Sequence, residues 1–409
     1  MTDRAGFSKI QDAADGPISI WIFIALAVTF GAQAMGSMIV YAPGVLAPVA
    51  RGDIGVSASS AGVMTSICYL GCFLATFFSG QVIARVGPLR CSQFSLVIMA
   101  LGTALTAAAN ILLVVLGGLI LGIGYGALTP TSSAILVKRA PLKMRATILS
   151  IKQTGVPAGG ILAGGLIPLL ILAFHWKVTV LILAGACALL AALIQPTRAE
   201  FDGGDTPVSA TARQSPTASL RMLWENGRLR EVSMVSFMYG GMQMMFVSFF
   251  VVYLTQHAGL TLVKAGGAMA AGMIAGVLAR VLWGVVADRL VKPRILLALV
   301  GFGTSAATVA MAMITPGWHL LAVYAVGIAM GATSIAWNGV YLAEIARVAP
   351  QGDIGTATSA SLMFNYGGVV LFPSLCWAII RATGSYTSMF LLMAALNALT
   401  ALVLLRRRT

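Results

Sequence analysis

Two basic residues lie inside long apolar stretches of the sequence. Lys152 falls in the run 146–173 and Arg280 in the run 264–286, and no aspartate or glutamate lies near the middle of any such run. A charge inside a lipid-spanning segment has to face protein or water, so it marks a candidate functional site. Arginine offers a planar fork of donors to a carboxylate, and lysine offers a mobile point charge. If the two cations converge, we expect them to bind a small anion.

Other polar side chains within the apolar runs are candidates to shape the same pocket. They are Gln33, Tyr41, Tyr125, Thr129, Gln153, Tyr239, Gln243, Trp337, Asn338, Asn365 and Tyr366. Buried amides and hydroxyls need hydrogen-bond partners, which a substrate can provide in a carrier. Hydrogen bonding between neighbouring helices is an equally good account of each one. For Lys152 and Arg280 the alternatives are a backbone carbonyl, a carboxylate of a gate, or extension towards the membrane surface.

Membrane-spanning helices must position these side chains. The chain of 409 residues is 59% hydrophobic and only 9% charged, which leaves too little polar surface for a soluble globule. Apolar runs of about 20 residues, bounded by turn and charge signals, predict twelve spans. The fifth and sixth are expected at 146–173 and 178–195. Because backbone groups in lipid must be hydrogen-bonded internally, we predict an all-α membrane protein.

Lysine and arginine gather in alternate loops, which sets the orientation. Basic residues mark the cytoplasmic side, so both termini are expected in the cytoplasm and the chain in the cytoplasmic (inner) membrane. Residues 196–231 are rich in Gly, Ser, Thr, Pro and Ala and are expected to form a linker. The predicted units are a cytoplasmic tail at 1–17, a six-helix bundle at 18–195, the linker at 196–231, a second six-helix bundle at 232–405, and a cytoplasmic tail at 406–409.

The two predicted bundles repeat each other. Gly80 aligns with Gly284 and Arg85 with Arg289 at the same offset, because 284 − 80 and 289 − 85 are both 204. The expected site of a duplicated bundle of this kind lies between its halves, near the middle of the membrane.

The repeated segment resembles a family motif, G-x-L-a-D-R-x-G-r-R, in the loop between helices 2 and 3. The second copy holds Gly284, Asp288, Arg289 and Arg294; the first holds Gly80, Arg85, Gly87 and Arg90, with Ala84 where the motif has aspartate. Through this motif and the duplication, the chain resembles the major facilitator superfamily over essentially its whole length. The resemblance implies two pseudo-symmetric six-helix bundles, alternating access and a cytoplasmic gate. It also makes Glu344 and Arg347 gate residues.

A narrower resemblance concerns Arg280. The spacing of Arg280, Gly284 and Asp288 is similar to helix 8 of oxalate:formate exchangers, nitrate/nitrite porters and monocarboxylate porters. In those carriers the matching arginine contacts the anionic substrate. Nitrate porters carry a second arginine in helix 2, but the duplicate of position 280 is Thr76, which makes nitrate less favoured.

The predicted function is secondary transport of a small organic anion, with a carboxylate as the expected substrate. Because no acid lies inside a span, proton symport or facilitated anion exchange is expected rather than sodium coupling. We expect a monomer in lipid without a cofactor or a metal. The basic residues lie in short loops between spans, which argues against nucleic-acid binding. Two alternatives stay open: proton-coupled efflux of drugs or other small molecules, and a receptor that does not transport. An enzyme is not expected, because the sequence has no nucleotide loop, metal cluster or nucleophile–base pair.

Overall fold

The protein is built of helices. The computed structural model describes residues 19–141, 144–202, 216–349 and 354–406, and no strand occurs in these ranges. The elements are α2 (Ile20–Ile54), η1 (Ala58–Ser60), α3 (Ala61–Val86), α4 (Pro88–Thr106), α5 (Ile111–Arg139), α6 (Arg145–Gln153), α7 (Gly155–Leu193), η3 (Gln195–Thr197), α8 (Arg198–Asp202), α9 (Pro216–Glu225), α10 (Gly227–Gln256), α11 (Leu262–Arg289), α12 (Pro293–Ala312), α13 (Leu320–Met330), η5 (Gly331–Ile335), α14 (Asn338–Val348), α15 (Ile354–Thr383) and α16 (Tyr386–Arg406). The predicted fold class, an all-α membrane protein, is confirmed.

Eleven stretches of the described chain are long and apolar enough to cross a membrane. One of them, Ile148–Asp202, is 55 residues long and contains the sixth predicted span and all but the first two residues of the fifth. His175 interrupts α7 with a φ of 64°. The part of α7 before His175 packs on α2, and the part after it packs on α4, where the Cys187 thiol donates to the Leu96 carbonyl at 3.2 Å. The chain therefore reverses direction at this residue.

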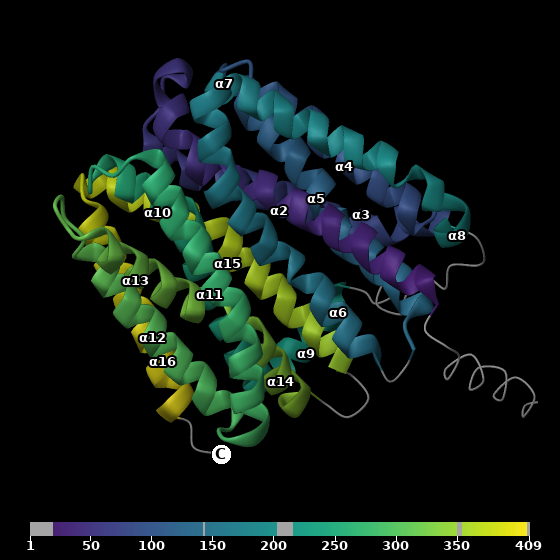
Figure 1. Ribbon diagram of the computed structural model, residues 1–409. Helices are drawn as coiled ribbons and strands as arrows, with labels where there is room; N and C mark the ends of the chain where they lie inside the picture. The colour runs from purple at the N-terminus through teal and green to yellow at the C-terminus, as the bar shows by residue number, and fades with distance from the viewer. Residues whose placement is uncertain (1–18, 142–143, 203–215, 350–353, 407–409) are drawn as a thin grey trace, which may run out of the picture.

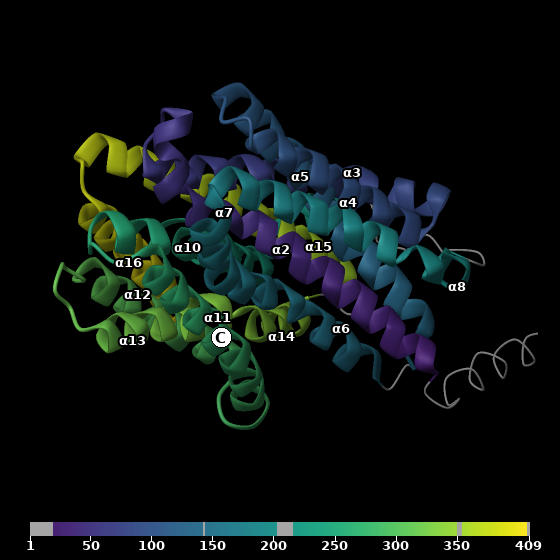
Figure 2. The same cartoon turned by 45° about the horizontal axis from the view of Figure 1, so that its top comes forward.

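Two groups of helices with the same internal pairing make up the molecule (Figures 1 and 2). In the first half, α2 packs on the first part of α7, α3 on α5, and α4 on the second part of α7. In the second half, α10 packs on α15, α11 on α13, and α12 on α16. Between the halves, α7 packs on α11 and α3 packs on α15. The duplication predicted from the sequence is thus present as a repeated packing pattern.

Polar caps and prolines determine where several helices begin. Asn110 accepts from the Leu112 amide at 3.0 Å at the start of α5, and Asn226 accepts from the Arg228 amide at 3.1 Å at the start of α10. Such side chains satisfy amides that have no acceptor within the helix. Proline occupies the first position of α4 and α12, where its missing N–H is not needed.

The tenth predicted span is a broken helix. It consists of α13, the π-helical turn η5, and α14, with Ala336 and Trp337 outside regular helix. A π-helical turn interrupts the regular i to i−4 hydrogen-bond ladder, and such turns are frequent at functional sites. This break lies beside Arg280, as described below.

Close backbone contact joins α3 and α5. A side-chain carbon at Gly122 would collide with the carbonyl group of Cys68, so these helices approach through backbone atoms. Small residues at helix interfaces allow this approach in membrane proteins.

We expect Gly122→Val to destabilise the protein by about 1–3 kcal/mol or more, because the added carbons force the two helices apart. The five cysteines are buried, so a fluorogenic maleimide that reacts on thermal unfolding can report the midpoint. Gly165→Val is the control, because Gly165 on α7 is exposed and a carbon added there meets nothing within 4 Å. Equal midpoints for the two variants would contradict the prediction.

Candidate functional site

Arg280 is held against the break in the tenth span. Its Nη2 donates to the carbonyl of Ile335 at 3.0 Å, and the Trp283 indole donates to the carbonyl of Ala332 at 2.8 Å. Gly276 allows α11 to approach Ile335 closely. Carbonyl groups at an interrupted helix need hydrogen-bond donors from outside the ladder, and side chains of α11 provide them here.

One nitrogen of Arg280 has no partner among the described residues. Its Nε is buried and makes no hydrogen bond to any of them. The Tyr41 hydroxyl of α2, in the other half of the molecule, lies close enough to interact with the guanidinium, and Arg280 forms no ion pair with a described carboxylate. Burying a charge without a compensating partner is unfavourable. The guanidinium therefore lies between the halves with one buried donor unpaired by the described residues.

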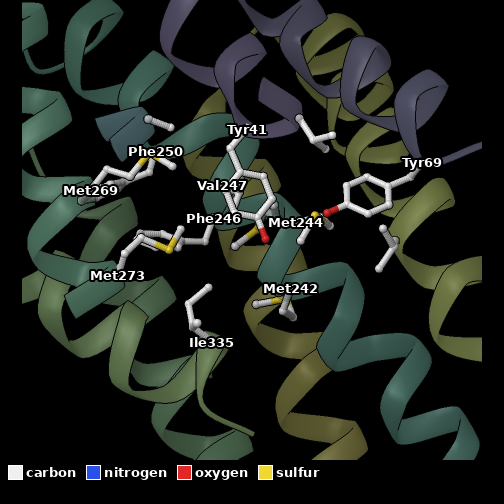
Figure 3. Close-up of a cluster of buried hydrophobic side chains, with 14 of the residues drawn as sticks. Tyr41, Tyr69, Met242, Met244, Phe246, Val247, Phe250, Met269, Met273 and Ile335 are labelled. Carbon is white, nitrogen blue, oxygen red and sulfur yellow. The ribbon is translucent and has the colours of Figure 1, made fainter. Parts of the chain in front are cut away.

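Neutral hydrogen-bonding groups from both halves surround Tyr41. Its hydroxyl is within hydrogen-bonding reach of Tyr69 on α3 and Gln243 on α10. The Gln243 carbonyl oxygen accepts from the Trp337 indole at 3.2 Å. In Figure 3 the rings of Tyr41 and Tyr69 reach into a region bordered by apolar side chains of the second half, among them Met273 and Ile335. The region thus combines one charged group, several neutral polar groups and an apolar wall.

The candidates of the first half form a connected network. The Tyr125 hydroxyl accepts from Gln33 Nε2 at 3.2 Å and shares a 3.0 Å hydrogen bond with Ser37. Thr129 donates to Gln33 Oε1 at 3.2 Å. The ring of Tyr125 meets that of Tyr69 edge to face, with 6.2 Å between centroids. Tyr69 therefore links this network to Tyr41 and Arg280.

Sequence reasoning did not single out Tyr69. The signal available in the sequence was the internal repeat, which aligns Tyr69 with Met273 at the offset of 204. Both side chains lie in the cluster of Figure 3.

The remaining aromatic and amide candidates have different surroundings. Tyr366 on α15 lies against the ring of Phe73 on α3, with 6.2 Å between centroids, so it belongs to the boundary. Tyr239 donates to the Leu297 carbonyl at 2.8 Å, and Asn365 donates to the Ser236 carbonyl at 2.9 Å. Asn338 donates to Ile335, at 3.4 Å. These last three pair within the second half.

Lys152 and Arg280 have different hydrogen-bond partners. Lys152 is only 1% exposed, and its Nζ donates to Gln153 Oε1 at 3.0 Å. In the described part of the chain the two cations share no hydrogen-bond acceptor, because Arg280 donates to the Ile335 carbonyl. Lys152 is thus a second buried cation, in the first half, with a neutral acceptor.

Most gate candidates lie at the helix ends that are predicted to be cytoplasmic. Arg294 pairs with Glu231 at 2.6 Å, and Arg347 pairs with Glu344 at 3.5 Å, each within the second half. Arg90 donates to Gln195 at 3.3 Å, within the first half. Gly80 lies within α3, Gly284 has open space around it, and Arg85 and Arg289 are exposed. The side chain of Asp288 lies outside the described residues.

The first half also carries a carboxylate contact that sequence reasoning did not single out. Asp202, at the end of α8, accepts from the amide of Leu89 at 2.7 Å and from that of Arg90 at 3.2 Å. Both amides belong to the start of α4, which follows the end of α3, where Ala84 stands instead of the aspartate of the motif. The prediction assigned Asp202 to the linker.

Polar contacts join the halves at the opposite end, which we call the outer end. Arg51 at the end of α2 donates to Gln256 at the end of α10, at 2.7 Å. Ser248 donates to Thr65 at 3.0 Å, and the Ser374 amide donates to the Ser66 hydroxyl at 3.1 Å. These contacts hold α2 and α3 of the first half against α10 and α15 of the second half at one end of the boundary.

A separate apolar cavity of about 260 Å³ lies in the first half between α2, α3, α4, α5 and α7. Its lining is mostly apolar, with Leu46, Met64 and Val180, but it also includes Trp377 of α15 and one charged residue, Arg51, which donates to Gln256. A site for a small polar ligand needs an orienting group that is free to bind it, so the region around Arg280, with its unpaired Nε, is the better candidate.

A helical membrane protein of two matched halves, with a charged site between them, has the architecture of a membrane transporter. The family model for the Major Facilitator Superfamily matches residues 22–373, and the chain belongs to that superfamily of transporters. The predicted family is confirmed.

Two relatives show what kinds of transporter the sequence is similar to. It is 21% identical to the hexuronate transporter of Bacillus subtilis over 415 residues, which cover 95% of this chain and 94% of that protein. It is 25% identical to a protein of Cupriavidus necator named "Probable sulfoacetate transporter" over 267 residues, which cover 61% of this chain and 60% of that protein.

Solved structures share the fold. A POT family transporter in complex with 5-aminolevulinic acid has a TM-score of 0.77 at 11% identity, over 93% of this chain and 95% of that one. A bacterial homologue of the human lysosomal transporter Spinster, inward-facing and unoccupied, has a TM-score of 0.71 at 16% identity, over 94% of this chain and 95% of that one.

We expect Lys152→Met to leave the thermal unfolding midpoint unchanged or to raise it. Methionine fills a similar volume without placing an ammonium group next to a neutral acceptor, and removal of an uncompensated buried charge is favourable. The matched control is Lys138→Met, at an exposed lysine near the end of α5. A midpoint several degrees below that of the control would mean that Lys152 stabilises the fold.

Proposed function

We propose that this transporter carries a small organic anion, with a carboxylate or a sulfonate as the charged group. Arg280 binds that group, and the neutral groups around Tyr41 contact the rest of the molecule. The support comes from the site and from the relatives, because hexuronate and sulfoacetate are both organic anions.

The observation that carries the proposal is the buried Nε of Arg280 without a partner. The guanidinium bonds to one neutral carbonyl, Ile335, and its electrostatic neighbour is a tyrosine. A carboxylate or sulfonate would supply the missing charge and acceptor together, and hydrogen bonds to charged groups are stronger than neutral ones. A cationic drug would be repelled by the same guanidinium.

Binding at this place touches both halves. Tyr41 and Tyr69 come from the first half, and Arg280, Gln243 and Trp337 come from the second. A ligand bound by residues of both halves depends on how the halves are placed relative to each other, which suits transport by alternating access. In this proposal the contacts of Arg51 and Ser248 at the outer end keep that side closed, and they separate when the site opens outwards.

The remaining parts of the proposal concern energetics and orientation. Lys152, in the first half, adds a second buried positive charge to that of Arg280 in the second half. A proton moves with the anion, so that the transported pair is neutral. The chain acts as a monomer in the cytoplasmic membrane with both termini in the cytoplasm, in agreement with the basic residues of its loops.

We expect Arg280→Ala to weaken anion binding by about 10–100-fold, because a hydrogen bond to a charged group contributes about 1.5–3 kcal/mol. The purified variants are screened by thermal shift against carboxylates, sulfonates, nitrate and cationic drugs, since a ligand of the folded state raises the midpoint. Arg228→Ala, at an exposed arginine near the start of α10, should respond as the parent does. Equal anion responses in both variants would remove Arg280 from the site, and stabilisation by cationic drugs alone would favour efflux.

We expect Gly44→Val to impair transport at least ten-fold by holding the outer ends apart, since overpacking at a close contact separates helices. A carbon added at Gly44 would collide with the Val247 carbonyl of the other half. Gly31→Val is the control on the same helix, because a carbon there meets nothing within 4 Å. Uptake of the anion found in the screen is measured together with labelling of Ser248→Cys by an impermeant maleimide added to intact cells. Unchanged uptake and labelling would contradict closure through this contact.

A further inference from the structure

Asp202 is bound to the start of α4 by two hydrogen bonds. Its two carboxylate oxygens accept from the amides of Leu89 and Arg90, at 2.7 and 3.2 Å. Amides in the first turn of a helix have no acceptor within the helix, and a negative charge is favourable there. Gly87 permits the approach, because it has a φ of 88° and a side-chain carbon there would collide with the Asp202 carboxylate.

The residues next to Asp202 are held equally firmly. The Glu200 carboxylate accepts from Arg139, at the end of α5, at 2.5 Å. Phe201 is 1% exposed, and its ring meets that of Trp21, near the start of α2, edge to face at 6.1 Å. The segment Arg198–Asp202 therefore ties together the ends of three helices of the first half.

The internal repeat shows what this carboxylate adds. Since 84 + 204 = 288 and 90 + 204 = 294, Ala84 aligns with Asp288 and Arg90 aligns with Arg294. The first half keeps the arginine at the start of its third span but lacks the aspartate of the loop before it. In the second half, Arg294 is held by a carboxylate, Glu231, at 2.6 Å. Asp202, from a distant part of the sequence, places a carboxylate at the start of α4 in the first half.

We propose that Asp202 is the gate carboxylate of the first half, where it acts as a positioning residue. It fixes the loop between α3 and α4, and with it Arg90, in the arrangement needed to meet the second half when the inner end closes. The inference goes beyond the proposed anion transport, and its test requires no substrate.

The test measures the distance between the halves at the inner end. Spin labels are attached to cysteines at Lys138 and Leu290, both exposed, in the full-length protein in lipid nanodiscs; the native cysteines are buried and are replaced. Asp202→Ala should reduce the short-distance population at least three-fold. Ala84→Asp added to Asp202→Ala should restore that population, while Ala84→Asn added to it should not.

Several results would overturn the proposal. An unchanged distance distribution in Asp202→Ala, with only a lower unfolding midpoint, would make Asp202 a local helix cap. Failure of Ala84→Asp to restore the distribution would lead to the same conclusion. Should Asp202→Ala not fold, Asp202→Asn retains one acceptor oxygen without the charge, and it should show a reduced short-distance population at an unfolding midpoint close to that of the parent.

Discussion

The need to satisfy one buried guanidinium determines how the centre of this molecule is built. Arg280 is placed where two helical bundles meet, away from every described carboxylate, so it depends on carbonyl and hydroxyl oxygens. The break at Gly331–Ile335 supplies the first acceptor, and Gly276 lets α11 come close enough to use it. A regular tenth helix would keep its carbonyls for its own ladder. The π-helical turn, the glycine and the arginine are therefore one structural unit, which a bound anion would complete in the function proposed above.

The same boundary explains why the two ends of the molecule differ. At the outer end, Arg51 and Ser248 make hydrogen bonds from one half to the other. At the inner end, Arg294 and Arg347 pair within their own half. A site between such halves is bordered by different groups whenever the halves move, because Tyr41 and Gln243 approach it from opposite sides. This coupling of site and domain position is what a carrier requires.

The charged residues of the two halves do not follow the internal repeat. The helix pairings repeat between the halves, yet the position that holds Arg280 in the second half holds Thr76 in the first, since 280 − 204 = 76. The helix end that carries Asp288 in the second half has Ala84 in the first, where Asp202 comes from outside the repeat. A duplicated frame can keep its packing while its polar residues diverge, because helix packing depends on small and apolar residues. The charged residues can therefore differ between the halves while the helix packing is the same.

The sequence by itself determined the fold class and the family, and it predicted Arg280 as a site residue. These follow from composition, from apolar runs and from a motif, all of which are local along the chain. It also indicated Tyr41, Gln243 and Trp337, which the structure gathers near the guanidinium. Only the tertiary structure decided that Tyr239 points towards α12, that Tyr69 joins the cluster, and that Lys152 has Gln153 as its acceptor. The reason is physical: an apolar helix carries almost no periodic signal for its rotation in a bundle, so the contacts of each polar side chain are decided by packing between distant segments.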